Sequence, residues 1–320
     1  MEAKRNQGLK RMAQLFSFKN LNLSFGQKSL FNNAGLTVRE KDQIGLIGLN
    51  GQGKSTLFRI IMGDVSPDHS TPAFEYTKSS DPFSIFLVPQ EIDVQTHEEL
   101  GIENFYLSFY PKLHKLYNNL ADESAMLEFE RLKGWDIQNS YLNYLARFNL
   151  KDLNRPLSSL SGGERKKLGL SIGLSTPAEV VLWDEPTNHL DIESIEIFEE
   201  EVVSQNKTYM IISHDRYLLD HTSNKIFHIE RGKITTFDGS YLDYLSFLNE
   251  KEKELQKNLD KLENRHRREL SWMRQGIKAR GTRSKKRVEG FHNIRGEIAS
   301  LKSRAKVVAD LHLSHSGRKT

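Results

Sequence analysis

The sequence predicts an α/β protein with a helical insertion and a helical C-terminal region. Apolar stretches alternate with helix-length segments over 43–63 and over 180–230, which is the βαβ alternation of a parallel sheet. Between them, residues 98–159 carry leucine and aromatic side chains at steps of three and four, which indicates helices. Leucines with the same spacing follow Tyr241, so we expect long helices after the α/β core.

The predicted strands differ in how continuously apolar they are. Residues 15–25 and 32–40 alternate apolar and polar side chains, as exposed or edge strands do. Residues 43–48 are nearly all apolar, which predicts a buried strand, and 53–63 has helical spacing that ends at Gly63. The remaining strands are predicted over 180–183, 209–213 and 225–230.

Composition excludes several classes of site. The 320 residues include no cysteine, so disulfides and thiolate metal sites are excluded. No stretch reaches the roughly 18–20 apolar residues of a membrane helix, and the N-terminus lacks the apolar core of a signal peptide. We therefore expect a soluble cytoplasmic protein without a membrane partner. The first 11 residues are polar and basic, which makes Met12 a candidate native start.

Charge is divided unevenly along the chain. Residues 264–320 carry 16 Lys or Arg and 4 Asp or Glu, whereas residues 1–263 carry 30 and 38. A basic segment on an acidic body favours a polyanionic partner, most often nucleic acid, over charge that only solubilises the chain.

These patterns divide the chain into four parts. We expect a basic extension over 1–14, an α/β core over 15–240 with a helical subdomain at about 98–175, a basic helical linker over 241–310 and a tail over 311–320. For the linker, the favoured structure is two helices folded against each other around a basic turn. The alternative is one long helix broken at Gly276 and Gly281.

The stretch GLNGQGKST, residues 48–56, matches the phosphate-loop pattern G-x-x-x-x-G-K-[ST] and lies between a predicted strand and a predicted helix. Loop amides and the helix N-terminus would bind phosphates, Lys54 would reach the β and γ phosphates, and Ser55 would help hold magnesium. We therefore expect a nucleotide with β and γ phosphates, together with Mg²⁺. The expected contacts are Gly48, Asn50, Gly51, Gly53, Lys54, Ser55 and Thr56.

Two carboxylates follow the apolar strand 180–183. Asp184, at the end of the strand, can hold the magnesium shell, and Glu185 beside it can polarise an attacking water. Alone, they could equally be two solvated carboxylates. The phosphate loop upstream favours the catalytic interpretation.

Three further candidates rest on weaker patterns. His214 follows the strand 209–213 and could meet the γ phosphate, although a histidine in that position is usually incidental. Gln90 ends a strand-like run and could reach the metal or the water through its amide. Phe25 could stack on adenine, and a buried core phenylalanine is an equal alternative.

The stretch LSGGERKKLGL, residues 160–170, begins a predicted helix. Ser161 and Glu164 have the spacing of a capping box, which accounts for the serine. Gly162 and Gly163 stay unexplained, because each weakens a first helical turn by up to about 1 kcal/mol. We expect an anion at this turn. Because the chain has one phosphate loop, that anion would be a nucleotide held by a second nucleotide-binding domain.

Five stretches together resemble an ATP-binding cassette: GLNGQGKST, PQ at 89–90, LSGGERKK, LWDEPTNHLD and SHDR, in that order. The intact DEPTNHLD resembles the ABC-F group, and the resemblance covers about residues 15–240. The stretch WMRQGIKARGTRSKKRV, residues 272–288, resembles the interdomain linker of the Uup branch of that group.

The resemblance implies a P-loop ABC ATPase fold and ATP hydrolysis at sites shared by two cassettes that close head to tail. Members normally carry two cassettes, associate with the ribosome near the tRNA exit site, and in the Uup branch are linked to branched DNA and transposon excision. We therefore expect the ribosome, with its rRNA and tRNA, as a partner, and DNA as the alternative. The ATPase subunit of a membrane transporter is a further alternative, but it gives no reason for the basic segment.

The resemblance also assigns roles to single residues. It implies Lys54 and Ser55 in the phosphate loop, Gln90 in the lid, Asp184 and Glu185 after the strand, His214 as the switch, Phe25 as the adenine platform, and Ser161 and Gly163 as signature residues that complete the site of the second cassette.

Three features depart from the family pattern. Glu164 replaces the usual glutamine and adds negative charge near the expected γ phosphate, and Gly281 replaces a second arginine. The chain stops at Thr320, shortly before a second cassette is expected. We therefore expect an excised half or a naturally short form.

The linker is strongly basic, with ten Lys or Arg and one acid, Glu269, over 264–287. Such a stretch favours salt-dependent and largely sequence-independent contact with phosphates. Trp272 is expected to pack in the helical hairpin, with base stacking as the alternative. The expected nucleic-acid contacts are Arg274, Lys278, Arg280, Arg283, Lys285, Lys286 and Arg287.

Overall fold

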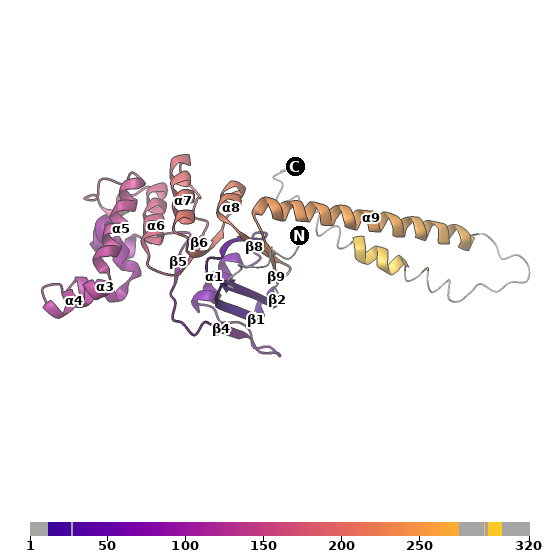
Figure 1. Cartoon of the computed structure of the whole chain (residues 1–320), viewed down its shortest axis with the longest axis horizontal. Helices are drawn as coiled ribbons and strands as arrows, with labels where there is room; N and C mark the ends of the chain where they lie inside the picture. Colours follow the sequence, from indigo (N-terminus) through magenta and orange to yellow (C-terminus); the bar gives the residue numbers. More distant parts are fainter. Residues whose placement is uncertain (1–11, 27, 275–290, 292–293, 303–320) are drawn as a thin grey trace, which may run out of the picture. The chain divides into compact units, whose positions relative to one another are not determined.

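The computed structural model describes residues 12–26, 28–274, 291 and 294–302. The chain divides into two compact units, residues 1–241 and 242–320. The first unit contains both β-sheets, and the second is helical in its described part (Figure 1). None of the described helices combines the length and the apolar character that crossing a bilayer requires.

The larger sheet of the first unit has the strand order β5-β6-β7-β3-β8-β9. Its strands are β3 (Gln43–Ile47), β5 (Ile85–Val88), β6 (Val180–Asp184), β7 (Thr208–Ile212), β8 (Lys225–Glu230) and β9 (Lys233–Asp238). The first five strands in this order, from β5 through β3 to β8, are parallel, and β9 is antiparallel to β8. Because the central strands are parallel, the loops after β3, β6 and β7 leave from the same edge of the sheet.

The smaller sheet is antiparallel, in the order β2-β1-β4. It contains β1 (Gln14–Phe25), β2 (Lys28–Arg39) and β4 (Glu75–Lys78). The prediction of an exposed or edge strand is wrong for β1, which is the central strand and is buried throughout 15–18. The reason is that β2 and β4 occupy both of its edges, while the rings of Phe74 and Tyr76 pack against Phe18.

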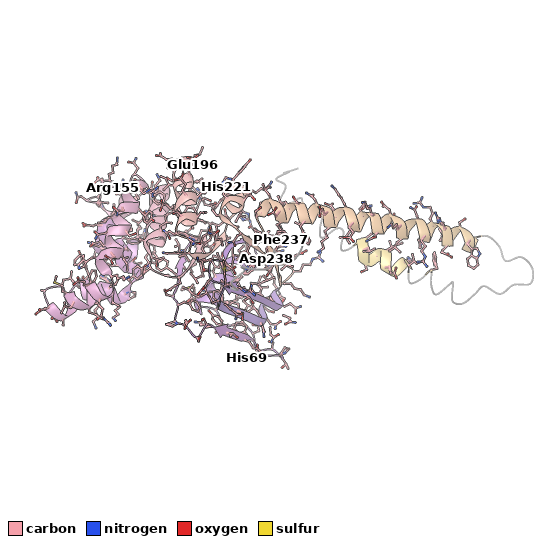
Figure 2. The ribbon with its side chains drawn as sticks, viewed as in Figure 1. His69, Arg155, Glu196, His221, Phe237 and Asp238 are labelled. Atoms are coloured by element: carbon pink, nitrogen blue, oxygen red, sulfur yellow. The ribbon has the colours of Figure 1, made fainter. Side chains whose placement is uncertain are left out.

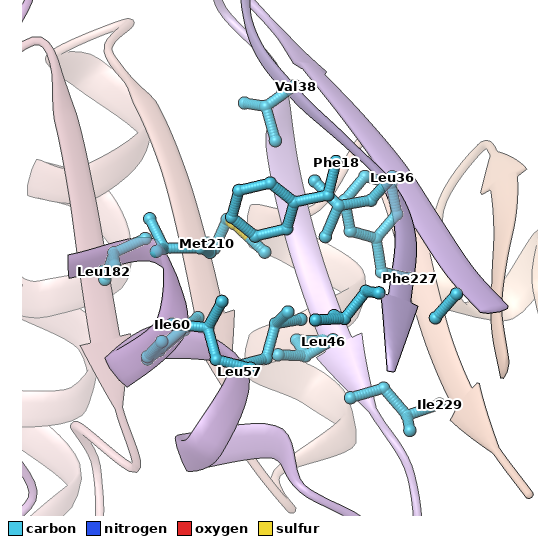
Figure 3. Close-up of a cluster of buried hydrophobic side chains, with 14 of the residues drawn as sticks. Phe18, Leu36, Val38, Leu46, Leu57, Ile60, Leu182, Met210, Phe227 and Ile229 are labelled. Atoms are coloured by element: carbon cyan, nitrogen blue, oxygen red, sulfur yellow. The ribbon is translucent and has the colours of Figure 1, made fainter. Parts of the chain in front are cut away.

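Helix α1 (Lys54–Met62) contributes to one apolar core that both sheets share (Figure 3). Leu57 and Ile60 of the helix belong to the same buried cluster as Leu46 and Met210 of the larger sheet and Phe18 of the smaller sheet. The glycine-rich loop 48–53 is therefore fixed at both ends, by a buried strand before it and a buried helix after it.

Residues 95–175 form a helical region with its own buried cluster (Figure 1). Its elements are η1 (Gln95–Leu100), α2 (Gly101–Asn104), η2 (Phe105–Phe109), α3 (Pro111–Tyr117), α4 (Glu123–Arg131), α5 (Gly134–Arg147), η3 (Leu157–Ser159) and α6 (Gly162–Ser175). Helices α7 (Ile192–Ser204) and α8 (Arg216–Thr222) follow β6 and β7.

The second unit consists mainly of α9 (Tyr241–Arg274), and residues 294–302 are also helical. Lys302 forms a 2.8 Å ion pair with Glu263, and the ring of Phe291 stacks on His266. A continuous helix would separate residues 263 and 302 by about 58 Å, at 1.5 Å per residue. The single-helix alternative is therefore wrong, and the chain folds back on itself between the two helical segments.

Several sequence predictions fall outside the described residues. They are the start of the basic extension at 1–11, the tail 311–320, and the basic turn with Gly276, Lys278, Arg280, Gly281, Arg283, Lys285, Lys286 and Arg287. Arg274 is the last residue of α9, and its side chain also lies outside the described part.

Candidate functional site

The phosphate loop joins β3 to α1 through backbone that requires glycine. Gly51 and Gly53 have φ of 73° and 99°, which is the left-handed region. A Cβ at Gly53 would also lie 3.0 Å from the ring of Phe31. No side chain caps α1, whose N-cap is Gly53 itself. The first amides of α1 are therefore open to an anion at the end of the helix where the dipole is positive.

Lys54 folds back over the phosphate loop. Its side chain is buried, with 8% of the residue exposed, and Nζ donates a 2.8 Å hydrogen bond to the carbonyl of Gly48. The carbonyl of Leu49 and Oδ1 of Asn50 each lie 3.5 Å from Nζ. Burial lowers the pKa of Lys54, and the charges of Glu185 and Asp184 oppose that shift. The lysine is thus a cation held close to two carboxylates.

Strand β6 brings both carboxylates to the edge where the phosphate loop lies. Asp184 ends the strand, and Glu185 follows it with 7% of the residue exposed and a left-handed φ of 49°. Oδ1 of Asp184 and Oε2 of Glu185 are buried and have no hydrogen-bond partner among the described residues. Burial raises the pKa of both groups, while Lys54 lowers that of Glu185 and a hydrogen bond from Ser55 lowers that of Asp184.

His214 follows β7 and connects the two halves of the site. Its Nε2 lies 3.0 Å from Oδ1 of Asn50 and 3.4 Å from Oε1 of Glu185, and 58% of its side chain is exposed. Burial, followed by the positive charge of Lys54, lowers the pKa of His214. The imidazole therefore favours its neutral form, in which one ring nitrogen donates and the other accepts.

These groups surround a cavity of about 400 Å³, which we call the phosphate-loop cavity. The sequence-predicted residues that line it are Asn50, Gly51, Gly53, Lys54, Ser55, Thr56, Gln90, Asp184, Glu185 and His214. Asn188 and Ile212 also line it, and sequence reasoning missed both. Asn188 lies in the same loop as Glu185, so its place three residues further on was the available signal.

Other predicted residues do not line the phosphate-loop cavity. Gly48 contributes its carbonyl to Lys54 instead. Phe25 lies at the end of β1 with 56% of its surface exposed, which excludes the alternative of a buried core phenylalanine. Ser161, Gly162 and Gly163 also lie outside the lining of this cavity.

The signature turn, residues 160–164, has the capping box that the sequence predicts. Oε2 of Glu164 accepts hydrogen bonds from the amide and the hydroxyl of Ser161, at 2.9 and 2.8 Å. Oε1 pairs with Arg155, which is labelled in Figure 2. The hydrogen bond from Arg155, followed by those from Ser161, lowers the pKa of Glu164 to about 2. The extra charge of this residue is therefore paired within the chain.

The two signature glycines differ in their surroundings. A Cβ on Gly163 would lie 3.2 Å from the carbonyl of His189, so close packing inside the chain accounts for this glycine. A Cβ on Gly162 would meet no atom within 4 Å among the described residues. An approaching anion is therefore needed to explain only one of the two glycines, Gly162.

Two lysines of α6 contact the segment that follows β6, and sequence reasoning missed both. Nζ of Lys166 donates a 3.1 Å hydrogen bond to the carbonyl of Glu185. Nζ of Lys167 lies 2.7 Å from Oδ2 of Asp191, whose Oδ1 caps α7 by accepting from the amide of Ser194. The two lysines closely follow the signature glycines, which was the only signal in the sequence.

The oxygen donors at this edge of the sheet fit Mg²⁺. The unpartnered Oδ1 of Asp184, the hydroxyl of Ser55 and the amide oxygen of Gln90 are the available groups. Within the described residues, no three His, Asp or Glu side chains gather into a metal site. Mg²⁺ typically takes one or two carboxylates together with substrate phosphates, so phosphate oxygens would complete its shell.

Comparison with known proteins identifies the family. Two family models, both described as ABC transporter, match residues 31–188 and 227–306. The ATP-binding protein Uup of Escherichia coli is 33% identical over an aligned length of 320 residues. The match covers 92% of this chain and 48% of that protein. The ABC transporter ATP-binding protein YfmR of Bacillus subtilis is 32% identical over 300 residues, or 89% and 47% of the two chains.

A third relative is the energy-dependent translational throttle protein EttA of Mycobacterium tuberculosis, which is 28% identical over 298 residues. That match covers 88% of this chain and 52% of EttA. The chain therefore spans about half the length of the curated relatives it matches.

Solved structures show the same fold. An ATP-binding subunit of an ABC transporter superposes with a TM-score of 0.55 at 17% identity, covering 72% of this chain and 91% of that one. The ATP-binding cassette MJ0796, in a dimeric post-hydrolysis state bound to ADP and Pi, superposes with a TM-score of 0.54 at 21% identity, covering 70% and 98%. By its motifs, its relatives and its fold, this chain belongs to the ABC family of ATP-binding proteins, in the ABC-F group.

Proposed function

We propose that this chain binds ATP in the phosphate-loop cavity and hydrolyses it when a second cassette completes the site. The observation that carries the proposal is the buried pair of carboxylates beside Lys54, each with one oxygen that lacks a partner among the described residues. Buried polar groups are usually paired, so this arrangement favours a polar ligand in the cavity. The open N-terminus of α1 favours a ligand with phosphates.

In the proposed reaction, Glu185 accepts the proton of the attacking water. Its raised pKa makes the carboxylate a stronger base than an exposed glutamate, and the charge of Lys54 limits that rise by favouring the ionised form. Lys54 would leave the carbonyl of Gly48 and turn its charge toward the β and γ phosphates. Neutral His214, within reach of Glu185 and Asn50, would hydrogen-bond the γ phosphate or the water.

The metal would be held by Asp184 and Ser55, with Gln90 as a third donor. When bound, Mg²⁺ would neutralise charge that builds up on the β and γ phosphate oxygens.

A second cassette is part of the proposal because Ser161 does not line the phosphate-loop cavity of its own cassette. Its hydroxyl and the open face of Gly162 suit a phosphate brought by another cassette. The structural relative MJ0796 is dimeric with bound ADP and Pi, which supports such pairing. The partner would be a second copy of this chain or a second cassette in a longer protein.

We further propose that the basic segment after residue 264 contacts ribosomal RNA and tRNA. The charge balance of this segment favours a polyanion, and the name of the relative EttA refers to translation. DNA is the alternative polyanion, and it is one arm of the experiment that tests the proposal.

The test measures ATPase rate per chain against protein concentration, with and without ribosomes or branched DNA, at two salt concentrations. We expect the rate to rise with concentration, and ribosomes to stimulate it less at the higher salt concentration. Stimulation by DNA alone would identify the other polyanion. A rate near zero at every concentration would contradict hydrolysis by paired copies of this chain.

Mixing two variants tests the shared site directly. In a head-to-tail pair, a chain with Ser161→Ala and a chain with Glu185→Gln would form one intact site and one doubly altered site. Each variant alone is expected to be nearly inactive. A symmetric pair predicts that their equimolar mixture recovers up to about a quarter of the native rate. No recovery would contradict a site built from two chains.

A further inference from the structure

Lys166 belongs to the signature stretch LSGGERKK, but none of the nucleotide contacts proposed for that stretch involves its side chain. It lies on α6, five residues after Ser161, and its side chain is half-buried. Its Nζ donates to the carbonyl oxygen of Glu185, at 3.1 Å. The contact is made to the backbone of Glu185 and not to its carboxylate. It therefore acts on the conformation of that residue.

The backbone of Glu185 is strained, so a hydrogen bond to its carbonyl can help to hold it in place. Its φ of 49° is left-handed, a conformation that a residue with a side chain avoids unless its surroundings impose it. On one side, the amide of Glu185 donates to the carbonyl of Ile212 in β7, at 3.0 Å. On the other side, Lys166 holds the carbonyl. The two hydrogen bonds fix the peptide groups before and after the Cα that carries the carboxylate.

A comparison with Lys207 separates this role from ordinary packing. Lys207 is also partly buried, donates to the backbone carbonyl of Thr176 at 2.6 Å, and has a pKa lowered by burial. It lies at the start of β7, whereas the phosphate-loop cavity lies at the other end of the parallel strands. The two lysines thus share burial and chemistry but differ in which carbonyl they hold.

We propose that Lys166 is a positioning residue for Glu185: by binding its carbonyl, it holds the strained peptide in the conformation that points the carboxylate into the phosphate-loop cavity. This inference rests on the proposed function, because it assigns a purpose to the orientation of the proposed base. Without the hydrogen bond, the peptide would relax toward commoner conformations. The carboxylate would then spend less time where the attacking water must bind.

Three variants of the chain test this proposal: Lys166→Met, Lys166→Arg and the matched control Lys207→Met. We expect Lys166→Met to lower the kcat for ATP by about 10- to 100-fold, the size of one lost charge-assisted hydrogen bond, and to leave KM within about twofold. Lys166→Arg keeps the charge and the donor, so it should recover most of the rate. Lys207→Met should leave kcat and KM at the native values.

Hydrogen–deuterium exchange over residues 184–191 provides a readout that does not depend on turnover. We expect Lys166→Met to accelerate exchange in this segment by about tenfold, because the strained peptide loses one of its two restraints. Lys207→Met and Lys166→Arg should leave the segment at the native rate. If the native chain bound ATP without hydrolysing it, the proposed function would fail, while the exchange comparison would still decide the role of Lys166.

Two results would overturn the inference. One is native exchange over 184–191 in Lys166→Met together with a native kcat, which would mean that Glu185 holds its conformation unaided. The other is faster exchange throughout the cassette without recovery in Lys166→Arg, which would identify Lys166 as a packing residue only.

Discussion

Two helices of this cassette begin at glycine-rich turns, but one N-terminus has no side-chain cap and the other has a capping box. Helix α1 begins after Gly53, which has a φ of 99° and offers its first turn no side-chain cap. Helix α6 begins after Ser161, whose capping box with Glu164 pairs the amides of both residues within the chain. The surroundings differ in the same sense. Beside α1 lie two buried carboxylate oxygens without partners in the described structure, whereas both oxygens of Glu164 are engaged.

From this difference we infer that the N-terminus of α1 can hold a ligand by itself, whereas that of α6 needs a ligand brought by a second cassette. Uncapped amides and unpaired buried groups are unfavourable until a ligand pairs with them, so the phosphate-loop cavity gains stability on binding. At the signature turn, the amides of Ser161 and Glu164 are already paired. A phosphate must compete there with Glu164 for the hydroxyl of Ser161. We therefore expect substitutions around the N-terminus of α1 to change chemistry and binding, and those at the signature turn to change stability and pairing.

The largest effect is expected for Glu185→Gln. Replacing the proposed base should lower kcat by about 10²- to 10⁴-fold, the usual range for general-base catalysis. The affinity for ATP should persist or rise, because the substitution removes a negative charge beside the phosphates. Phosphate release and binding of a fluorescent ATP analogue measure the two quantities. Turnover at the native rate would contradict the assignment of Glu185 as the base.

Lys54→Met should act on binding at the same helix N-terminus. Loss of a charged donor to the phosphates predicts an affinity for ATP that is about 10- to 100-fold weaker. The pKa of Glu185 should rise, because the positive charge that now opposes burial is removed. Titration with the fluorescent analogue measures the affinity, and Lys207→Met again provides the matched control. Native affinity in the variant would mean that Lys54 stays on the loop carbonyls when nucleotide binds.

The sequence predicts the α1 side of this comparison well because its signals are local. Lys54, Ser55 and the glycines are adjacent in one loop, and a strand and a helix fix that loop at its two ends. The apolar runs likewise predict the strand that ends at Asp184 and the strand that precedes His214. What periodicity does not give is strand order. β1 alternates like an exposed strand but lies between β2 and β4, because β4, which follows about 50 residues later in the chain, pairs with its second edge.

Contacts between segments explain what the sequence leaves out around α6. The capping box is local and was predicted, but the pairing of Arg155 with Glu164 depends on where the loop before α6 turns. The hydrogen bond of Lys166 to Glu185 spans 19 residues, and the spacing of the two motifs does not predict it. The packing of Gly163 against His189 is of the same kind. Such contacts follow from the fold, so they become visible only with it.

Ser161→Ala should lower the stability of the chain without changing how it binds ATP, which would distinguish the role of the α6 N-terminus from that of α1. Loss of an N-cap side chain predicts a decrease of about 1 kcal/mol in the free energy of unfolding. Binding of ATP to the same chain should stay native, because Ser161 does not line the phosphate-loop cavity. Urea unfolding and analogue titration measure the two quantities. Weaker ATP binding at a concentration where the chain is monomeric would contradict the proposed division between the helices.

The smallest effect is expected for Arg155→Met, and it should depend on pH. The folded pKa of Glu164, about 2, lies below its ordinary value of 4.5, so this pair contributes stability above about pH 5 that is lost as pH falls toward 2. Because the pair is partly exposed, the variant should lose less than about 1 kcal/mol at pH 7. The gap should shrink as pH falls from about 5, because the pKa of Glu164 in the variant lies nearer 4.5. Urea unfolding of both proteins at about pH 7 and about pH 4 measures the gap. A gap of the same size at both pH values would mean that Arg155 supports α6 by packing and not through its ion pair with Glu164.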